Sequence, residues 1–79
     1  MAQFRIPLNE NQFLSLKKGD EIIGKRFNWI VTRNAIKPSK ISSPTVYLDT
    51  NDDFGPRKYY FFDEKIVDEQ FGIKMDLNF

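Results

Sequence analysis

One segment constrains the fold of this chain more than any other: two basic residues followed by four aromatic ones, Arg57-Lys58-Tyr59-Tyr60-Phe61-Phe62. Aromatic residues in such a run favour a β-strand. Successive side chains of a strand point to opposite faces, so the first and third rings face one way and the second and fourth the other. The strand therefore has apolar bulk on both faces. Either the fold covers both faces, or one face is left exposed as a binding surface.

The length of the chain limits how much surface the fold can cover. Its 79 residues allow one hydrophobic core, because folding at this size buries only about 60% of the surface of the unfolded chain. The sequence therefore predicts a single domain over residues 1–79. With 41% hydrophobic and 15% aromatic residues, the composition excludes a disordered chain.

The order of apolar and turn-forming residues predicts an α+β fold that is mainly β. Alternating apolar residues and capping signals give the following elements: strands over 3–8, 21–33 (with a bulge or bend at Gly24), 45–49, 57–62 and 73–79, and short helices over 9–19 and 63–72. A strand is the alternative for residues 65–67. The Pro- and Ser-containing stretch 34–44 predicts a mobile loop.

These elements suggest a single small antiparallel sheet of about five strands with one or two short helices. The sheet either rolls into a small SH3-like or OB-like barrel or stays open with helices on one face. Within the strand over 21–33, Trp29 shares a face with Phe27 and Val31, which predicts a place in the core. A role as a stacking or anchor residue is the alternative for Trp29.

Residue types that are missing exclude several kinds of site. The chain has no Cys and no His, which rules out disulfides, thiolate metal sites and imidazole bases. The run over 49–53 begins like a calcium-binding EF-hand loop, but Phe54 stands where Gly is needed and Tyr60 where the bidentate Glu belongs. The paired carboxylates are sequence neighbours, whereas acid–base catalysis needs carboxyl groups that converge across a pocket. We therefore expect no enzyme, no cofactor and no metal site.

The charges are unevenly divided along the chain. Residues 1–40 carry eight basic and three acidic residues, whereas residues 41–79 carry four basic and eight acidic ones. We expect the halves to interleave in space, because strands distant in sequence often lie side by side in small sheets. The alternative is a basic face for nucleic acid, with the following contacts: Lys17, Lys18, Lys25, Arg26, Arg33, Lys37 and Lys40.

These observations predict a small non-enzymatic binding module that docks on another protein. Tyr beside Arg or Lys is typical of protein interfaces, and the residues of this kind predicted to bind the partner are Tyr47, Arg57, Lys58, Tyr59 and Tyr60. The same combination serves single-stranded nucleic acid, so a nucleic-acid-binding β-barrel is the alternative function. A structural component of a larger assembly is a further one.

Composition also bears on origin and location. Phe, Ile, Lys and Asn supply 30 residues, whereas Gly, Ala, Arg and Pro supply 14. The first group has AT-rich codons, which suits a phage or mobile-element accessory protein that modulates or inhibits a host factor. The first residues lack the pattern of a signal peptide, and the longest apolar stretch, 59–62, is too short to span a membrane. We therefore expect a cytoplasmic protein.

Overall fold

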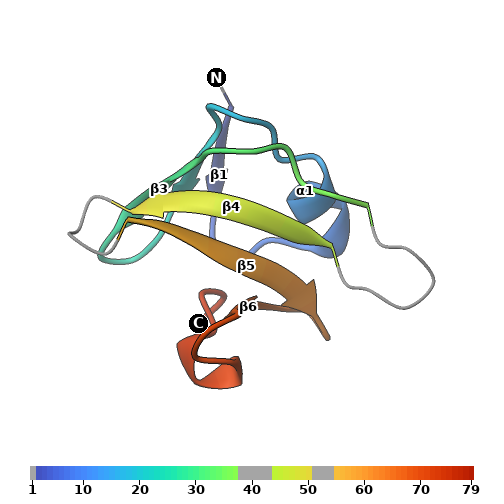
Figure 1. Ribbon diagram of the computed structural model, residues 1–79, viewed down its shortest axis with the longest axis vertical. Coiled ribbons are helices and arrows are strands. Elements are labelled where there is room, and N and C mark those ends of the chain that lie inside the picture. The colour runs from blue at the N-terminus through green and yellow to red at the C-terminus, as the bar shows by residue number, and fades with distance from the viewer. Residues whose placement is uncertain (1, 38–43, 51–54) are drawn as a thin grey trace.

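The computed structural model describes residues 2–37, 44–50 and 55–79, and this described part is mainly β (Figure 1). Its elements in chain order are β1 (Gln3–Arg5), α1 (Glu10–Leu14), β2 (Glu21–Ile23), β3 (Asn28–Val31), β4 (Thr45–Thr50), β5 (Pro56–Phe62), β6 (Lys65–Asp68) and the 3-10 helix η1 (Ile73–Met75). The predicted loop over 34–44 lies partly outside the described residues, as does most of the acidic turn over 49–53.

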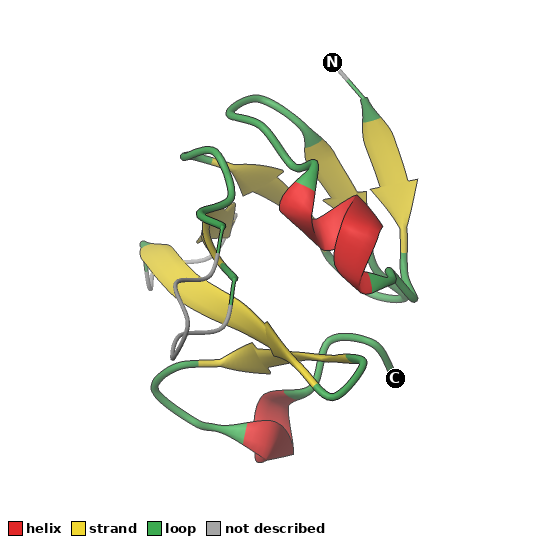
Figure 2. Ribbon diagram, turned by 90° about the vertical axis from the view of Figure 1, so that its right-hand side faces the viewer, coloured by secondary structure: helices red, strands yellow, loops and turns green. Residues whose placement is uncertain are grey.

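The strands form one open, mixed sheet. Their order in the sheet follows the chain, β1 to β6, and each strand pairs antiparallel with the next, except that β1 runs parallel to β2. The connection between β1 and β2 contains α1, which lies inside the curve of the sheet (Figure 2). β1 and β6 are the two edges of the sheet. The prediction of an antiparallel sheet is therefore wrong for the first strand pair, and the SH3-like or OB-like barrel is not formed.

The first helix begins where the sequence predicts and ends earlier. Asn9 is the N-cap, and a capping box joins it to Gln12: Asn9 Oδ1 accepts from Gln12 N at 2.8 Å, and Asn9 N donates to Gln12 Oε1 at 2.9 Å. The helix stops at Leu14 rather than near Gly19. The following turn is held by the carboxylate of Asp20, which accepts a hydrogen bond from Lys17 N at 2.9 Å. This side chain competes with helical hydrogen bonds and directs the chain into β2.

The predicted long strand over 21–33 is a hairpin. β2 and β3 pair antiparallel, with Ile22 opposite Trp29, and residues 24–27 form the connection between them. Gly24 therefore marks a reversal of the chain rather than a bulge. As a consequence Phe27 lies in the connection with 66% of its surface exposed, while Trp29 is buried. The prediction that Trp29 belongs to the core is confirmed, and the prediction that Phe27 shares its environment is wrong.

The predicted helix over 63–72 is wrong, and the alternative of a strand is confirmed. Asp63 and Glu64 both have left-handed backbone conformations, with φ of 51° and 60°, and they form a two-residue connection typical of a β-hairpin. β6 then pairs with β5 and buries Ile66 and Val67 on opposite faces. Pairing with the aromatic strand outweighs the helix-capping signals of this segment, because it buries more apolar surface.

The predicted strand over 73–79 is also wrong, although its apolar residues alternate strictly. Residues 73–75 form η1, and the chain then turns. The carboxylate of Asp76 accepts hydrogen bonds from Asn78 N at 2.9 Å and from Ile66 N at 3.2 Å. A side chain that binds backbone N–H groups in this way replaces the regular ladder of a strand. Leu77 packs against the core, and the other apolar side chains of the segment remain mostly exposed.

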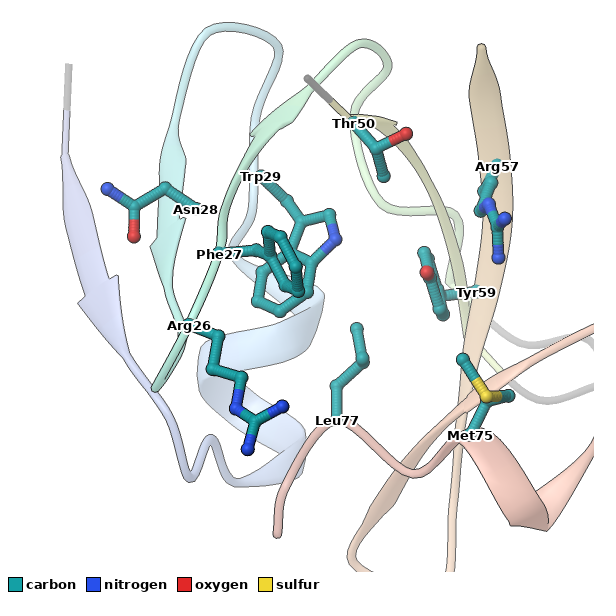
Figure 3. A pocket seen from close by; sticks show the side chains of 9 residues that line it. All are labelled: Arg26, Phe27, Asn28, Trp29, Thr50, Arg57, Tyr59, Met75 and Leu77. Atoms are coloured by element: carbon teal, nitrogen blue, oxygen red, sulfur yellow. The ribbon is translucent and has the colours of Figure 1, made fainter. Parts of the chain in front are cut away.

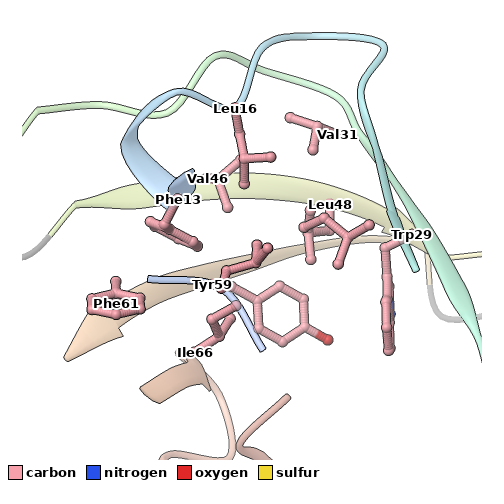
Figure 4. Close-up of a cluster of buried hydrophobic side chains, with 11 residues drawn as sticks. Phe13, Leu16, Trp29, Val31, Val46, Leu48, Tyr59, Phe61 and Ile66 are labelled. Carbon is pink, nitrogen blue, oxygen red and sulfur yellow. The ribbon is translucent and has the colours of Figure 1, made fainter. Parts of the chain in front are cut away.

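The core lies between α1 and the concave face of the sheet (Figure 4). α1 contributes Phe13, whose ring centroid lies 5.6 Å from that of Phe61 on β5. The buried side chains of the cluster are Leu8, Phe13, Leu16, Ile22, Trp29, Val31, Val46, Leu48, Tyr59, Phe61 and Ile66. We call the concave face that carries them the inner face of the sheet, and the opposite one the outer face.

Candidate functional site

The five residues predicted to bind a partner do not share one face of the sheet. Tyr59 and Arg57 point to the inner face, where Tyr59 is 2% exposed. Lys58 and Tyr60 alternate with them and point to the outer face, as does Tyr47, which is the register partner of Lys58. The aromatic strand is thus covered on the inner face, and its outer side chains are half-buried or exposed. The structure divides the predicted site in two.

On the outer face, Tyr47 is flanked by positive charges. The guanidinium carbon of Arg33 lies 4.5 Å from the centre of its ring, and Lys58 Nζ lies 5.9 Å from it. Lys58 also forms an exposed ion pair with Glu69, with Nζ to Oε1 at 3.5 Å. A shallow pocket of about 650 Å³ over these residues also includes the carboxylate of Asp49. Charges of both signs mix here, so this surface has no strong preference for an anion.

On the inner face, a pocket of about 500 Å³ lies between β3 and β5, the strands on either side of β4 (Figure 3). One wall is the connection between β2 and β3 with the start of β3, and the opposite wall is β5 with the end of η1 and the residues that follow it (Figure 3). The residues that line it are Arg26, Phe27, Asn28, Trp29, Thr50, Arg57, Tyr59, Met75 and Leu77. The pocket is therefore assembled from segments at both ends of the chain.

The pocket is chiefly apolar and aromatic. Trp29 and Tyr59 are buried, and their rings contribute to the core as well as to the pocket. Phe27 and Met75 are exposed and lie at the mouth. A concave apolar surface with a small number of polar groups is the usual form of a binding site. This pocket is the strongest candidate site in the described part of the chain.

Two arginines supply the charge of the pocket. Arg57 Nη1 lies 3.1 Å from Asp68 Oδ2, and the side chains of this pair are 16% and 3% exposed. Asp68 Oδ1 also accepts a hydrogen bond from Gln70 N at 2.7 Å. Arg57 is therefore held in place and its charge is balanced. Arg26 is exposed and forms no ion pair with any described residue.

The predicted nucleic-acid contacts do not form one patch. Lys17 and Lys18 precede β2, and Lys18 N donates to Asn34 Oδ1 at 2.9 Å, which places them near the end of β3 and Arg33. Lys25 and Arg26 lie at the other end of the β2–β3 hairpin. Lys37 is exposed beyond β3, and Lys40 lies outside the described residues. The expectation that the basic and acidic halves interleave is not met by the strands: their order follows the chain, so β1–β3 of the basic half and β4–β6 of the acidic half lie side by side and adjoin at the β3–β4 pair, where Asp49 is opposite Ile30.

Over residues 2–37, 44–50 and 55–79, no three or more acidic side chains gather in a way that could hold a metal ion. Over the same residues, no helix has the length and apolar character needed to cross a membrane.

Sequence reasoning assigned no binding role to Phe27, Met75 or Leu77, although all three line the pocket. Their contribution depends on the hairpin connection at 24–27 and on η1 with the turn after it, whereas the sequence predicts strands for both segments. One local signal favours a hairpin connection here and so an exposed Phe27: a small residue followed by two charged ones, Gly24-Lys25-Arg26.

Comparison with protein-family models, with curated proteins and with solved structures finds no match to this chain.

Proposed function

We propose that this protein is a non-enzymatic binding module that docks on another protein through its inner-face pocket. The observation that supports the proposal is an aromatic pocket whose mouth carries exposed apolar side chains. Phe27 is 66% and Met75 is 40% exposed, beside the buried rings of Trp29 and Tyr59. Aromatic side chains in a well-packed pocket are typical of the residues that dominate the binding energy of protein interfaces.

The extent of the apolar surface favours a protein over a small molecule. Beyond the pocket, Phe71 is 48% exposed, and its ring centre lies 5.5 Å from the guanidinium carbon of Arg57. Ile73, two residues further on, is 54% exposed. Exposed apolar side chains therefore continue from the pocket along the segment that contains η1. Apolar patches that reach beyond a single pocket usually mark interaction surfaces.

The same geometry argues against the alternative of nucleic acid. A protein that binds nucleic acid chiefly through phosphate contacts needs cations gathered along one surface. Here the predicted basic contacts lie at opposite ends of the β2–β3 hairpin, and Lys58 is paired with Glu69. Two observations support a non-enzymatic protein. The chain has no Cys and no His, and the buried carboxylate of Asp68 is engaged in an ion pair with Arg57.

The test compares two exposed phenylalanines on different faces. Phe27 lies at the pocket mouth, whereas Phe62 is 53% exposed on the outer face. Wild type, Phe27→Ser and Phe62→Ser are used to capture partners from cells that produce the protein, after nuclease treatment. The captured partner is then purified and titrated against each protein. Both variants should keep the melting temperature of wild type, because neither side chain is buried.

We expect Phe27→Ser to weaken binding of the purified partner by at least about tenfold, and Phe62→Ser to leave it unchanged. The opposite pattern would place the docking surface on the outer face. Capture that disappears on nuclease treatment would favour the nucleic-acid alternative.

A further inference from the structure

The charge at the mouth of the pocket limits what the pocket can bind. Among its described lining residues are two guanidinium groups and no carboxylate. The charge of Arg57 is balanced by Asp68 at 3.1 Å. Arg26 is exposed and has no ion-pair partner among the described residues. Within the described part of the chain, the mouth therefore presents one positive charge without an ion-pair partner, beside an apolar interior.

The size of the pocket limits the shape of its occupant. A volume of about 500 Å³ is within the usual range for sites that hold small groups. An α-helix with its side chains is about 10–12 Å across and is too wide to enter such a space. One or two side chains fit it, so a segment of a partner reaches into the pocket with side chains alone.

We propose that the pocket takes an apolar side chain, aromatic or branched aliphatic, whose neighbour in the sequence of the partner protein carries a carboxylate. The apolar side chain packs between Trp29 and Tyr59, with Phe27 closing over it. The neighbouring carboxylate pairs with Arg26 at the mouth. This inference rests on the proposed function and adds the chemistry of the partner segment.

A carboxylate fits the site better than a phosphate group. Arginine binds both anions with the same two-pronged geometry. A phosphorylated side chain carries a charge of about −1.5 to −2 at neutral pH, whereas Arg26 is the one lining cation that has no ion-pair partner among the described residues. The carboxylate of Asp or Glu, with one negative charge, balances it.

The experiment uses the intact protein and three blocked dipeptides: N-acetyl-Phe-Asp-amide, N-acetyl-Phe-Asn-amide and N-acetyl-Phe-phosphoserine-amide. Trp29 is the only tryptophan of the chain, so its fluorescence and its indole N–H resonance report binding in the pocket directly. We expect the Phe-Asp peptide to bind with millimolar affinity, about fivefold more tightly than the Phe-Asn peptide, since a charged hydrogen bond is stronger than a neutral one.

Two neighbouring cations provide the matched variants. Arg26→Gln should abolish the preference for the Phe-Asp peptide while it leaves binding of the Phe-Asn peptide unchanged. Lys25→Gln removes the same charge one residue away, from a side chain that does not line the pocket, and should keep most of the preference. Added salt should reduce the preference in wild type, because exposed charges are screened.

Several results would overturn the inference. They are equal binding of the acidic and neutral peptides, tighter binding of the phosphoserine peptide, or no change at Trp29 with any peptide at millimolar concentration. Each is distinguishable from failure of the proposed function. If no peptide binds and Phe27→Ser still weakens binding of the purified partner, the proposed docking surface is supported. Only the proposed chemistry of the partner segment is then wrong. If the peptides bind and Phe27→Ser leaves the affinity for the purified partner unchanged, the proposed function is wrong.

Discussion

The side-chain amide of Asn78 binds both polar backbone groups of Leu8, 70 positions earlier in the chain. Asn78 Oδ1 accepts a hydrogen bond from Leu8 N at 3.0 Å, and Asn78 Nδ2 donates to Leu8 O at 3.0 Å. The same Nδ2 donates to Glu64 O at 2.9 Å. The edge strands β1 and β6 do not pair, so this amide joins the chain that leaves β1 to the segment that follows β6. It also fixes the neighbouring Leu77 as part of the pocket.

Replacing Asn78 by Asp should destabilise the protein by about 2–3 kcal/mol. A carboxylate can accept from Leu8 N but cannot donate, and it leaves the carbonyl groups of Leu8 and Glu64 facing a negative charge. Leu8 is buried, and a buried polar group that loses its partner costs about 1–3 kcal/mol, to which the repulsion of the carbonyl oxygens adds. Urea unfolding at neutral pH measures the change. Asn11→Asp is the control, because Asn11 is exposed on α1. Equal unfolding free energies for the two variants would contradict a role for the Asn78 amide.

Two adjacent acidic residues should differ strongly in their contribution to stability. Asp68 is buried and pairs with Arg57, whereas Glu69 is exposed and pairs with Lys58 at 3.5 Å. Removing one partner of a buried ion pair typically costs about 3–5 kcal/mol, and an exposed pair contributes about 0–1 kcal/mol. We therefore expect Asp68→Asn to lower the melting temperature by many degrees and Glu69→Gln to leave it nearly unchanged. A similar small loss in both would show that Arg57 finds another partner without cost.

The part of the fold that the sequence predicted correctly depends on signals between near neighbours. The hairpin of β4 and β5 follows from β-branched and aromatic runs on either side of a turn. The start of α1 follows from the spacing of Asn9 and Gln12, and the buried position of Trp29 from alternation within a strand. Each of these inferences needs information from only a few positions along the chain.

The segments predicted wrongly depend on partners far away in sequence. Residues 63–72 carry an Asp, a second acid and a closing Gly, which suit a helix cap and a hairpin turn equally well. The segment forms a hairpin and not a helix because residues 65–68 pair with the exposed edge of β5. In residues 73–79, alternation alone suggested a strand. There the side chain of Asp76 binds the backbone of Ile66 instead, and this contact has no local signal.

For the same reason, the sequence predicts only part of the candidate site. Alternation correctly separates Tyr59 from Tyr60, but it does not say which face is covered. The pocket combines the turn at 24–27 with Met75 and Leu77, and these segments face each other across the concave face of the sheet (Figure 3). Such an arrangement is a property of the tertiary structure. No spacing within either segment indicates it.

Gly24 is a contact point for the indole of Trp29, and Gly24→Ala should disturb the pocket. A Cβ at this position would lie 2.6 Å from Phe27 O and 2.7 Å from Trp29 Cη2. Both distances are well below van der Waals contact, so the indole must move. Overpacking of this kind costs about 1–3 kcal/mol. We expect a lower melting temperature and a changed emission maximum of Trp29, measured by thermal unfolding followed by fluorescence and circular dichroism.

A double variant checks the cause of that loss. Trp29→Phe shortens the ring that faces Gly24, so in that background Gly24→Ala should cost less than it does in wild type. The difference between the two costs measures the coupling between the residues. If the cost of Gly24→Ala is the same in both backgrounds, the strain lies in the backbone near Phe27 and not in the indole contact.

The adjacent residues Tyr59 and Tyr60 should respond in opposite ways to truncation. Tyr59 is 2% exposed and belongs to the core cluster, so Tyr59→Ala leaves a cavity and should cost about 3–5 kcal/mol. Tyr60 is half-buried on the outer face, where it lies opposite Thr45 and Val67 in the register of the sheet. Cross-strand pairs of this kind contribute about 0.2–1 kcal/mol, so Tyr60→Ala should lower stability only slightly. Urea unfolding of the two variants provides the measurement.

Binding of the purified partner separates the two tyrosines further. Under conditions where both variants are folded, Tyr59→Ala should weaken binding of the partner, because Tyr59 also forms part of the wall of the pocket. Tyr60→Ala should leave this binding unchanged. Tyr59→Phe keeps the ring and should retain most of the stability that Tyr59→Ala loses. If Tyr60→Ala is as destabilising as Tyr59→Ala, the outer face is covered as fully as the inner one. If instead Tyr60→Ala leaves the fold intact and abolishes partner binding, the docking surface is the outer face around Tyr47 and Lys58.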